Sequence, residues 1–401
     1  MKPLNRVVAA TPPSGIRRFF DVASRMKDVI SLGVGEPDFA TPWRIREAAI
    51  YSLEHGQTTY TGNAGLLALR RRIAALLRDR YGVAYDPETE ILVTTGVSEG
   101  LDLAYRAILN PGDEVISIEP SYVSYDPGIR FAGGEPVAVS TSGDDEFRLR
   151  VEHVAAAISP RTKALMLSYP CNPTGATQTR SDLQALVDLA VRHDLYIVSD
   201  EIYDRLTYVG EHVCVASLPG AKERTVLLNG FSKAYAMTGW RIGYVCAPVE
   251  VLQAMLKIHQ YTALCASHTA QRAAIEAIDH AEEDVRAMVA EYDRRRRFFV
   301  RGLRSAGLRC HEPRGAIYAF PYVAHTGLSS EEFATALLEE ERVAVVPGNA
   351  FGPAGEGYVR CSYATSLDHL EQAVDRIARF VARRGAAAEA RREPALEGAR
   401  S

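Results

Sequence analysis

The chain has 401 residues and a net charge of −4, and it is long enough for two domains. Its 47% hydrophobic and 24% charged residues are those of an ordinary soluble globular protein. The slightly acidic balance gives no reason to expect binding to nucleic acid or to an acidic membrane, and the arginine run at 293–299 is predicted to be a solvated helix face.

The six cysteines are scattered, without a CxxC pair or a His/Cys cluster, so no metal site is predicted. Such a pattern is typical of reduced thiols in the cytosol. The N-terminus contains prolines and lacks the apolar core of a signal peptide. No apolar run approaches the ~18–20 residues that span a bilayer. We therefore expect a soluble cytoplasmic protein.

Strand and helix patterns alternate through the first two thirds of the chain. The first ~45 residues lack this alternation, and we expect them to pack beside a smaller domain. After them, short apolar runs alternate with helix-like stretches such as 98–109 and 180–193, which predicts a mainly parallel sheet between helices. Only eleven residues join the last two runs, too few for a helical crossover, so one edge strand is expected to be antiparallel. The seven predicted strands are 90–95, 114–119, 135–140, 163–168, 195–200, 225–229 and 241–246.

The last third of the chain has a different pattern. Residues 268–306 are helical and highly charged, and they are predicted to lead out of the sheet domain. Three runs beyond them, 315–323, 342–347 and 357–364, indicate a second, smaller sheet. The tail at 383–401 has almost no large apolar residue, which predicts disorder. The expected organisation is an N-terminal segment at 1–45, a large domain at 46–285, a small C-terminal domain at 286–382 and the tail at 383–401.

A candidate anion site lies in "VTTGVSEGLDLAY" (93–105), which reads as a strand, a glycine and a helix. Backbone N–H groups at such a helix start bind anions, and Ser98 adds a hydroxyl. The motif lacks the lysine of a P-loop, so a single phosphate monoester is favoured over a nucleoside triphosphate. The glycine alone also fits a purely steric requirement of the turn.

Two further motifs follow predicted strands. "SYPCNPTGAT" (168–177) is a tight turn from which Asn172 could donate a hydrogen bond into a crevice. The strand "LYIVSD" ends in Asp200, and Tyr203 follows three residues later. The carboxyl ends of parallel strands face the ligand crevice of α/β proteins. Asp200 alone fits a helix N-cap, but a carboxylate there could also hold a proton on a heterocyclic nitrogen.

Lys233 lies in an almost uncharged segment, "GFSKAYAMTGWRIGY" (230–244), with Arg241 eight positions later. A lysine attacks carbonyl groups when a desolvated or cationic setting favours its neutral form. A Schiff-base lysine, an anion site that includes Ser232 and Arg241, and a carboxylate for a ring nitrogen are together the requirements of pyridoxal phosphate. We therefore predict this cofactor.

The combined motifs resemble those of fold-type I pyridoxal-phosphate aminotransferases of class I and II, near the bacterial aspartate and aromatic aminotransferases. The resemblance covers about residues 14 to 380. It implies a large domain with a mainly parallel seven-stranded sheet between helices, plus a smaller α+β domain. The motifs that carry it, in the family's order, are "LGVGEPDF" (32–39), "TYTGNAG" (59–65), "NPTG" (172–175), "SDEIY" (199–203), "FSKAYAMTGWRIGY" (231–244) and "VRCSYA" (359–364).

The resemblance implies a role for each matching residue around the cofactor. Lys233 would form the Schiff base and then move the proton between the substrate Cα and the cofactor C4′. Asp200 would pair with the pyridine nitrogen, and Tyr203 and Asn172 would hydrogen-bond the 3-oxygen. The other implied contacts are Tyr122 stacked on the ring, with Tyr125 as its rival, and Arg241, Ser232 and the amides of Val97 and Ser98 on the phosphate.

Substrate binding and assembly are implied in the same way. Arg360 would hold the substrate α-carboxylate through its bidentate fork, the backbone of Gly35 would close on that group, and Tyr122 and Asn172 would lie beside the substrate. Tyr60 matches a tyrosine that reaches the neighbouring subunit's phosphate, which implies a homodimer with shared active sites.

One position departs from the family pattern. Many relatives have a serine three residues before the lysine, and this chain has Gly230. Phosphate binding is therefore expected to depend on Ser232, Arg241 and the helix start.

We predict a reversible, ping-pong transamination from an L-amino acid to a 2-oxo acid, with 2-oxoglutarate as the acceptor that the resemblance implies. A C–S β-lyase and a synthase of the aminocyclopropane type use the same lysine and electron sink, and pyruvate plus ammonia without an oxo-acid acceptor would reveal the lyase. A ligand-sensing regulator is disfavoured because the resemblance begins near residue 14 and leaves no room for a DNA-binding segment. A nicotinamide oxidoreductase is disfavoured because no GxGxxG opens a strand–helix unit.

The sequence leaves the choice of substrate open among aspartate, aromatic and broad neutral donors. Ile16, Tyr122 and Tyr60 of the partner subunit are expected near the substrate side chain. Three arginines could meet a distal carboxylate, although each also fits a solvated helix or turn: Arg17, Arg18 and Arg106.

Overall fold

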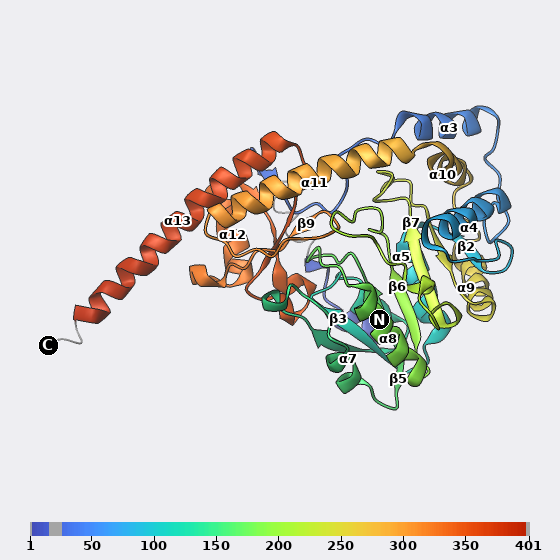
Figure 1. The fold of residues 1–401 in the computed structure, drawn as a ribbon, viewed down its shortest axis with the longest axis horizontal. Helices are drawn as coiled ribbons and strands as arrows, with labels where there is room; N and C mark the ends of the chain where they lie inside the picture. Colours follow the sequence, from blue (N-terminus) through green and yellow to red (C-terminus); the bar gives the residue numbers. More distant parts are fainter. Residues whose placement is uncertain (1, 16–25, 398–401) are drawn as a thin grey trace.

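The computed structural model describes residues 2–15 and 26–397, and for 385–397 it describes only the course of a helix (Figure 1). Among these residues, no helix is both long enough and apolar enough to cross a lipid bilayer. The short helix α1 (Arg6–Ala10) begins at Asn5, whose side chain accepts hydrogen bonds from the amides of Val7 and Val8.

A seven-stranded sheet forms the centre of the larger part of the molecule. Its order is β2-β8-β7-β6-β5-β3-β4, and all seven predicted strands are present within two residues of their predicted limits. Most strands are buried at every position, as expected for a sheet covered on both faces. The strands are β2 (Ile91–Thr94), β3 (Glu114–Glu119), β4 (Glu135–Ser140), β5 (Thr162–Ser168), β6 (Tyr196–Asp200), β7 (Thr225–Gly230) and β8 (Gly243–Cys246).

The position of the antiparallel strand differs from the prediction. Strand β8 is antiparallel to its neighbours, but it lies between β2 and β7 and is not an edge strand. The short β7–β8 connection does force the chain to reverse direction, as the residue count predicted. The edge strand on that side of the sheet is β2. It pairs with β8, which lies about 150 residues later in the chain, so connection lengths could not place it.

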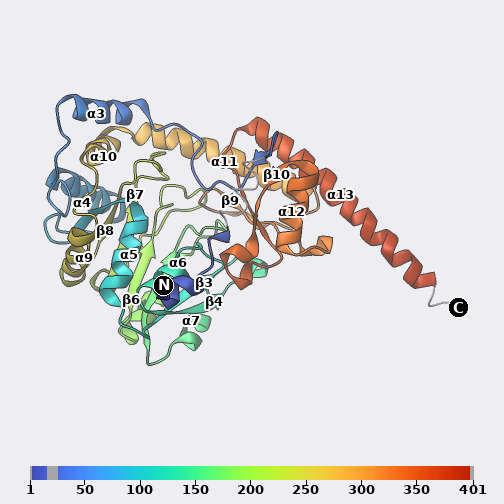
Figure 2. The ribbon, with the colours of Figure 1, turned by 180° about the vertical axis from the view of Figure 1, so that it is seen from behind.

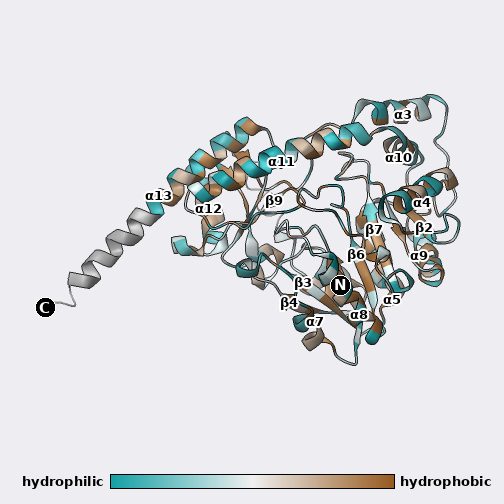
Figure 3. Ribbon diagram, in the orientation of Figure 1, coloured by the Kyte–Doolittle hydropathy of each residue, from teal (hydrophilic) through white to brown (hydrophobic). Residues whose placement is uncertain are grey.

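Helices cover both faces of this sheet (Figures 1 and 2). Alternate residues of β5 face opposite ways: Leu165 packs in a cluster with Leu186 of α8, and Met166 in a cluster with Leu101 of α5. Figure 3 shows the hydrophobic strands beneath helices that alternate hydrophobic and hydrophilic residues. The helices of this part are α3 (Trp43–Glu54), α4 (Leu67–Tyr81), α5 (Gly96–Ile108), α6 (Tyr125–Phe131), α7 (Val151–Ala157), α8 (Arg180–Arg192), α9 (Val249–Thr262) and α10 (His268–His280).

A long helix, α11 (Glu282–Ser305), leads from this region to the smaller part of the molecule (Figure 1). There, a three-stranded antiparallel sheet has the order β11-β12-β9, and β1 from the N-terminal segment pairs in parallel with β10. Phe299, Phe333 and Phe380, which belong to three different helices, pack in one buried cluster. The elements are β1 (Ile30–Ser31), β9 (Tyr318–Ala319), α12 (Ser330–Glu341), β10 (Val343–Ala344), β11 (Val346–Pro347), β12 (Val359–Ser362) and α13 (Leu367–Glu397).

Helix α13 includes the first part of the C-terminal tail, and the disorder expected at 383–401 remains a prediction. Helix α13 continues to Glu397 and extends away from the rest of the molecule (Figure 1). Arg383 still pairs with Glu341 of α12 at 2.7 Å. The segment beyond it is rich in Ala, Glu and Arg, which have high helix propensity, so local backbone hydrogen bonds favour a helix there. Residues 398–401 lie outside the described residues, and the domain boundaries remain predictions.

Candidate active site

Lys233 lies in the loop that follows β7, at the carboxyl end of the parallel strands. Its Nζ donates a hydrogen bond of 2.6 Å to the carbonyl oxygen of Gly35. Burial lowers the pKa of Lys233 to about 8, and the nearby Arg360 cation acts in the same direction. The carboxylates of Glu36 and Asp200 oppose this shift. The amine is therefore closer to its neutral, nucleophilic form than an exposed lysine is.

Asp200 ends β6 and is 6% exposed. One oxygen, Oδ1, accepts from the amide of Ile202 at 3.1 Å, but the segment after it forms turns, so Asp200 is not the N-cap of an α-helix. Burial raises the pKa of Asp200 to about 6, although the hydrogen bonds from Ile202 and Tyr125 and the charge on Lys233 act against the rise. A buried carboxyl group with this pKa would be held in its ionised form by a cationic partner.

Tyr125, the predicted rival of Tyr122, lies beside Asp200, a contact that the sequence did not reveal. Its hydroxyl lies 2.9 Å from Oδ2 of Asp200 and 2.8 Å from Oγ of Ser168. These contacts fix its ring beside the carboxylate. Tyr122 is partly buried and lies edge-on to Tyr125, with ring centroids 5.6 Å apart and an interplanar angle of 79°. The two tyrosines therefore have different surroundings, and Tyr122 is the one without a hydrogen bond to Asp200.

Tyr203 and Gly35 are joined by a residue that the sequence reasoning missed, Tyr318 of β9. The hydroxyls of Tyr203 and Tyr318 lie 2.7 Å apart, and the Tyr318 hydroxyl also donates to the carbonyl oxygen of Gly35 at 3.4 Å. A Cβ on residue 35 would lie 2.4 Å from that hydroxyl, so only glycine allows this approach. The ring of Tyr203 lies 5.8 Å from Nζ of Lys233.

Arg360 is a buried cation, 2% exposed, and among the described residues no carboxylate lies within ion-pair distance of it. Its Nη1 donates to Oδ1 of Asn172 at 3.0 Å and its Nη2 to the carbonyl oxygen of Gly33 at 2.6 Å. The guanidinium lies 4.4 Å from the ring centre of Tyr318 and 4.9 Å from that of Phe351. Its Nε has no hydrogen-bond partner in the described part of the chain. A buried cation without a counter-ion is costly, so this geometry is suited to a carboxylate ligand.

The start of α5 and Arg241 lie together where the sequence predicts an anion site. Gly96 opens the helix with φ +76°, and a Cβ there would lie 2.7 Å from Nη2 of Arg241. The guanidinium therefore lies directly over the first turn, whose backbone N–H groups include those of Val97 and Ser98. Ser232 is 8% exposed in the neighbouring loop. A positive charge beside free helix N–H groups is suited to a phosphate.

The glycine at position 230 has a steric reason. A Cβ on Gly230 would lie 2.9 Å from Cα of Gly243, on the adjacent strand β8. A serine there would push these two strands apart, so the close approach of β7 and β8 favours glycine at this position.

Several expected side chains are not part of this cluster in the single chain. Tyr60 is 81% exposed, on the loop between α3 and α4. Arg106 is exposed and pairs with Asp102 at 3.2 Å, which agrees with a solvated helix residue. Ile16, Arg17 and Arg18 lie outside the described residues.

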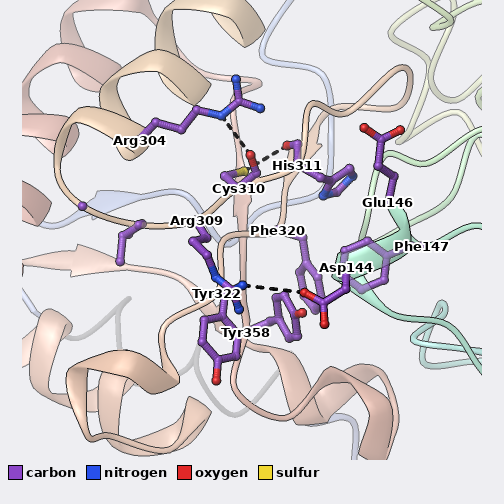
Figure 4. Close-up of a pocket in the computed structure, with 13 residues that line it drawn as sticks. Asp144, Glu146, Phe147, Arg304, Arg309, Cys310, His311, Phe320, Tyr322 and Tyr358 are labelled. Carbon is purple, nitrogen blue, oxygen red and sulfur yellow. Dashed lines mark hydrogen bonds and ion pairs between the residues drawn. The ribbon is translucent and has the colours of Figure 1, made fainter.

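The described part of the chain has no group of three or more His, Cys, Asp or Glu side chains that could hold a metal ion. A cavity of about 520 Å³ lies apart from Lys233, between the loop at 143–147 and the small domain (Figure 4). Its lining includes Arg309, paired with Asp144 at 3.6 Å, and none of the predicted site residues.

Comparison with known proteins places this geometry in a family. The family model described as aminotransferase class I and II matches residues 27–377. The chain is 46% identical to an aspartate aminotransferase of Pyrococcus abyssi and 44% identical to aromatic-amino-acid aminotransferase 2 of Thermococcus litoralis, in each case over 91% of this chain and 95% of the relative. A solved structure of aspartate aminotransferase from Thermus thermophilus with maleate has a TM-score of 0.90 and 42% identity, covering 94% of this chain and 100% of that one. These neighbours confirm the predicted α/β fold of fold type I.

Proposed function

The chain belongs to the class I and II aminotransferases, and we propose that it transfers the amino group of an L-amino acid to a 2-oxo acid. Aspartate, an aromatic amino acid or a broad range of neutral amino acids is the proposed donor, and 2-oxoglutarate the proposed acceptor. Relatives named for aspartate and for aromatic amino acids support this range. The observation that carries the proposal is Arg360, a buried cation to which the described residues offer no carboxylate partner, and which is close enough to Lys233 to lower its pKa.

We propose pyridoxal phosphate as the cofactor, because the residues present fit each of its groups. The amides of Val97 and Ser98, together with Ser232 and Arg241, would hold the phosphate. Asp200 would pair with the pyridine nitrogen. This pairing would explain why its carboxyl group is buried although no described arginine forms an ion pair with it. The other proposed contacts are Lys233 at the aldehyde, Tyr203 and Asn172 at the 3-oxygen, and Tyr122 on the ring face.

The chain's own groups would bind the substrate and move its proton. Arg360 would hold the α-carboxylate through its Nη atoms, with the Gly35 backbone closing on the same group. Lys233 Nζ, which has a pKa near 8, would accept the α-proton of the substrate and return a proton later in the cycle. The cofactor, when bound, supplies an electron sink for the negative charge left at Cα. Transfer in two half-reactions gives ping-pong kinetics.

The test is the visible absorbance of the purified protein with pyridoxal phosphate, during titration with single L-amino acids and no acceptor. We expect a yellow protein that each true donor converts to the aminated cofactor form, and 2-oxoglutarate should restore the original spectrum. Lys233→Ala is the control, in which the starting absorbance should be lost together with turnover. A colourless wild-type protein that stays unchanged with added pyridoxal phosphate would contradict the proposal.

We also propose a cytoplasmic homodimer with shared active sites. The support is Tyr60, which is 81% exposed in the single chain, and Tyr261, which is 85% exposed at the end of α9. In a dimer, Tyr60 of one protomer would reach the phosphate of the other. Mixing and refolding inactive Lys233→Ala with Tyr60→Ala should therefore restore activity, because each mixed dimer contains one site with both residues intact. An absence of recovery, with mixed dimers demonstrated by mass, would refute shared sites.

A further inference from the structure

We propose that His259 is a positioning residue for the phosphate end of the site: it holds the Glu99 carboxylate away from the backbone N–H groups that would bind the cofactor phosphate. The proposal rests on the proposed cofactor, and it concerns a histidine on α9 that no motif singled out. His259 contacts neither the reacting atoms nor the proposed phosphate, and it acts through Glu99.

The contact geometry places Glu99 between two donors. Nδ1 of His259 lies 2.7 Å from Oε1 of Glu99, and the backbone amide of Thr95 donates to Oε2 at 2.5 Å. Glu99 lies in the first turn of α5, directly after the Val97 and Ser98 amides. Helices α5 and α9 pack against each other, so the pair is held by two rigid elements. Both carboxylate oxygens are thus occupied, and neither bonds to those two amides.

The charge on Glu99 makes its position important. Burial alone would raise the pKa of Glu99, but the hydrogen bonds from His259 and Thr95 bring the pKa below its usual value, so the side chain is a carboxylate at neutral pH. A carboxylate is itself a favourable partner for free N–H groups at a helix start. If Glu99 were released, it could therefore occupy the Val97 and Ser98 amides and repel a phosphate dianion.

A purely structural role explains His259 less well. Its side chain is 0% exposed within the apolar environment of α5 and α9, and its Nε2 is buried without a partner among the described residues. Burying an unpartnered ring nitrogen is unfavourable, so an apolar side chain of similar size would pack there at a lower cost. What the imidazole contributes, and an apolar ring would not, is the Nδ1 hydrogen bond to Glu99.

The experiment compares two ligands of the cofactor-free protein, pyridoxal phosphate and pyridoxal. Both carry the aldehyde and the ring, so the contribution of the phosphate is isolated in one ratio: the dissociation constant of pyridoxal divided by that of pyridoxal phosphate. In His259→Phe we expect this ratio to fall about tenfold, the effect of one charged hydrogen bond, with pyridoxal affinity unchanged. In His259→Asn, whose amide N–H can replace Nδ1, the ratio should stay near the wild-type value. Thermal melting of each cofactor-free variant verifies folding.

The second arm is Glu99→Gln in the His259→Phe background. A neutral amide does not repel phosphate, so this double variant should recover the wild-type ratio, which a general packing defect would not do. An unchanged ratio in His259→Phe, or no recovery in the double variant, overturns the inference. If His259→Phe does not fold, Glu99→Gln alone decides, since a tenfold loss of its ratio would show that the carboxylate assists phosphate binding. A wild-type protein that binds both ligands equally would instead refute the proposed cofactor.

Discussion

Replacing Lys233 by methionine should stabilise the cofactor-free protein while it abolishes turnover. Burial lowers the pKa of Lys233 from 10.5 in the unfolded chain to about 8 in the fold. Below pH 8 the lysine is charged in both states, so folding has to bury a cation. Above pH 8 the folded state releases this proton first, and the penalty disappears as the pH approaches 10.5. The unfolded state binds more protons in this window, so wild-type stability contains a contribution that rises with pH.

The magnitude follows from the two pKa values. At pH 7 they correspond to a penalty of about 3 kcal/mol, and at pH 10 to less than about 1 kcal/mol. Lys233→Met removes this penalty but loses the hydrogen bond to the Gly35 carbonyl, which contributes about 1 kcal/mol. The variant should therefore be more stable than the wild type by about 2 kcal/mol at pH 7 and of about equal stability at pH 10.

The assay is urea unfolding of the cofactor-free proteins at pH 7 and pH 10, at one protein concentration. Lys257→Met, which changes an exposed lysine of α9, is the matched control and should shift neither curve. A Lys233→Met variant that is less stable than the wild type at pH 7, or whose advantage is the same at both pH values, would refute the argument from burial.

Three further substitutions test the geometry of the site. Arg360→Lys keeps the charge but loses the fork, so kcat/KM should fall about 100-fold while pyridoxal phosphate binding, measured by absorbance, stays unchanged. Asp200→Asn should still bind the cofactor but lower kcat about 1000-fold in steady-state assays, because an amide provides no charge for the ring nitrogen. Gly96→Ala places a Cβ 2.7 Å from Nη2 of Arg241 and should weaken pyridoxal phosphate binding about tenfold, whereas Gly82→Ala, which also has a positive φ but open space around it, should not.

The sequence by itself determined the strands and the main chemical groups. A strand buried on both faces needs a continuous apolar run, and such a run located β3 to the residue. Lys233 was evident because a lysine in an uncharged, aromatic-rich segment is unusual, and the surrounding motifs identified the family. Asp200 followed from its place at the end of a buried strand. These inferences use local composition, which is complete in the sequence.

The tertiary structure alone decided which distant residues meet. The antiparallel strand β8 lies inside the sheet because it pairs with β2 as well as with β7, and pairing partners leave no trace in local composition. Tyr318 and His259 were missed for the same reason, since each contacts a residue 115 or 160 positions away, and the contact of Tyr125 with Asp200, 75 positions away, was equally hidden. Side chains that look like ordinary packing residues in the sequence become site residues only when the fold brings a polar partner within 3 Å. Local propensity is short-ranged, whereas the position of a hydroxyl or an imidazole depends on how the whole chain packs.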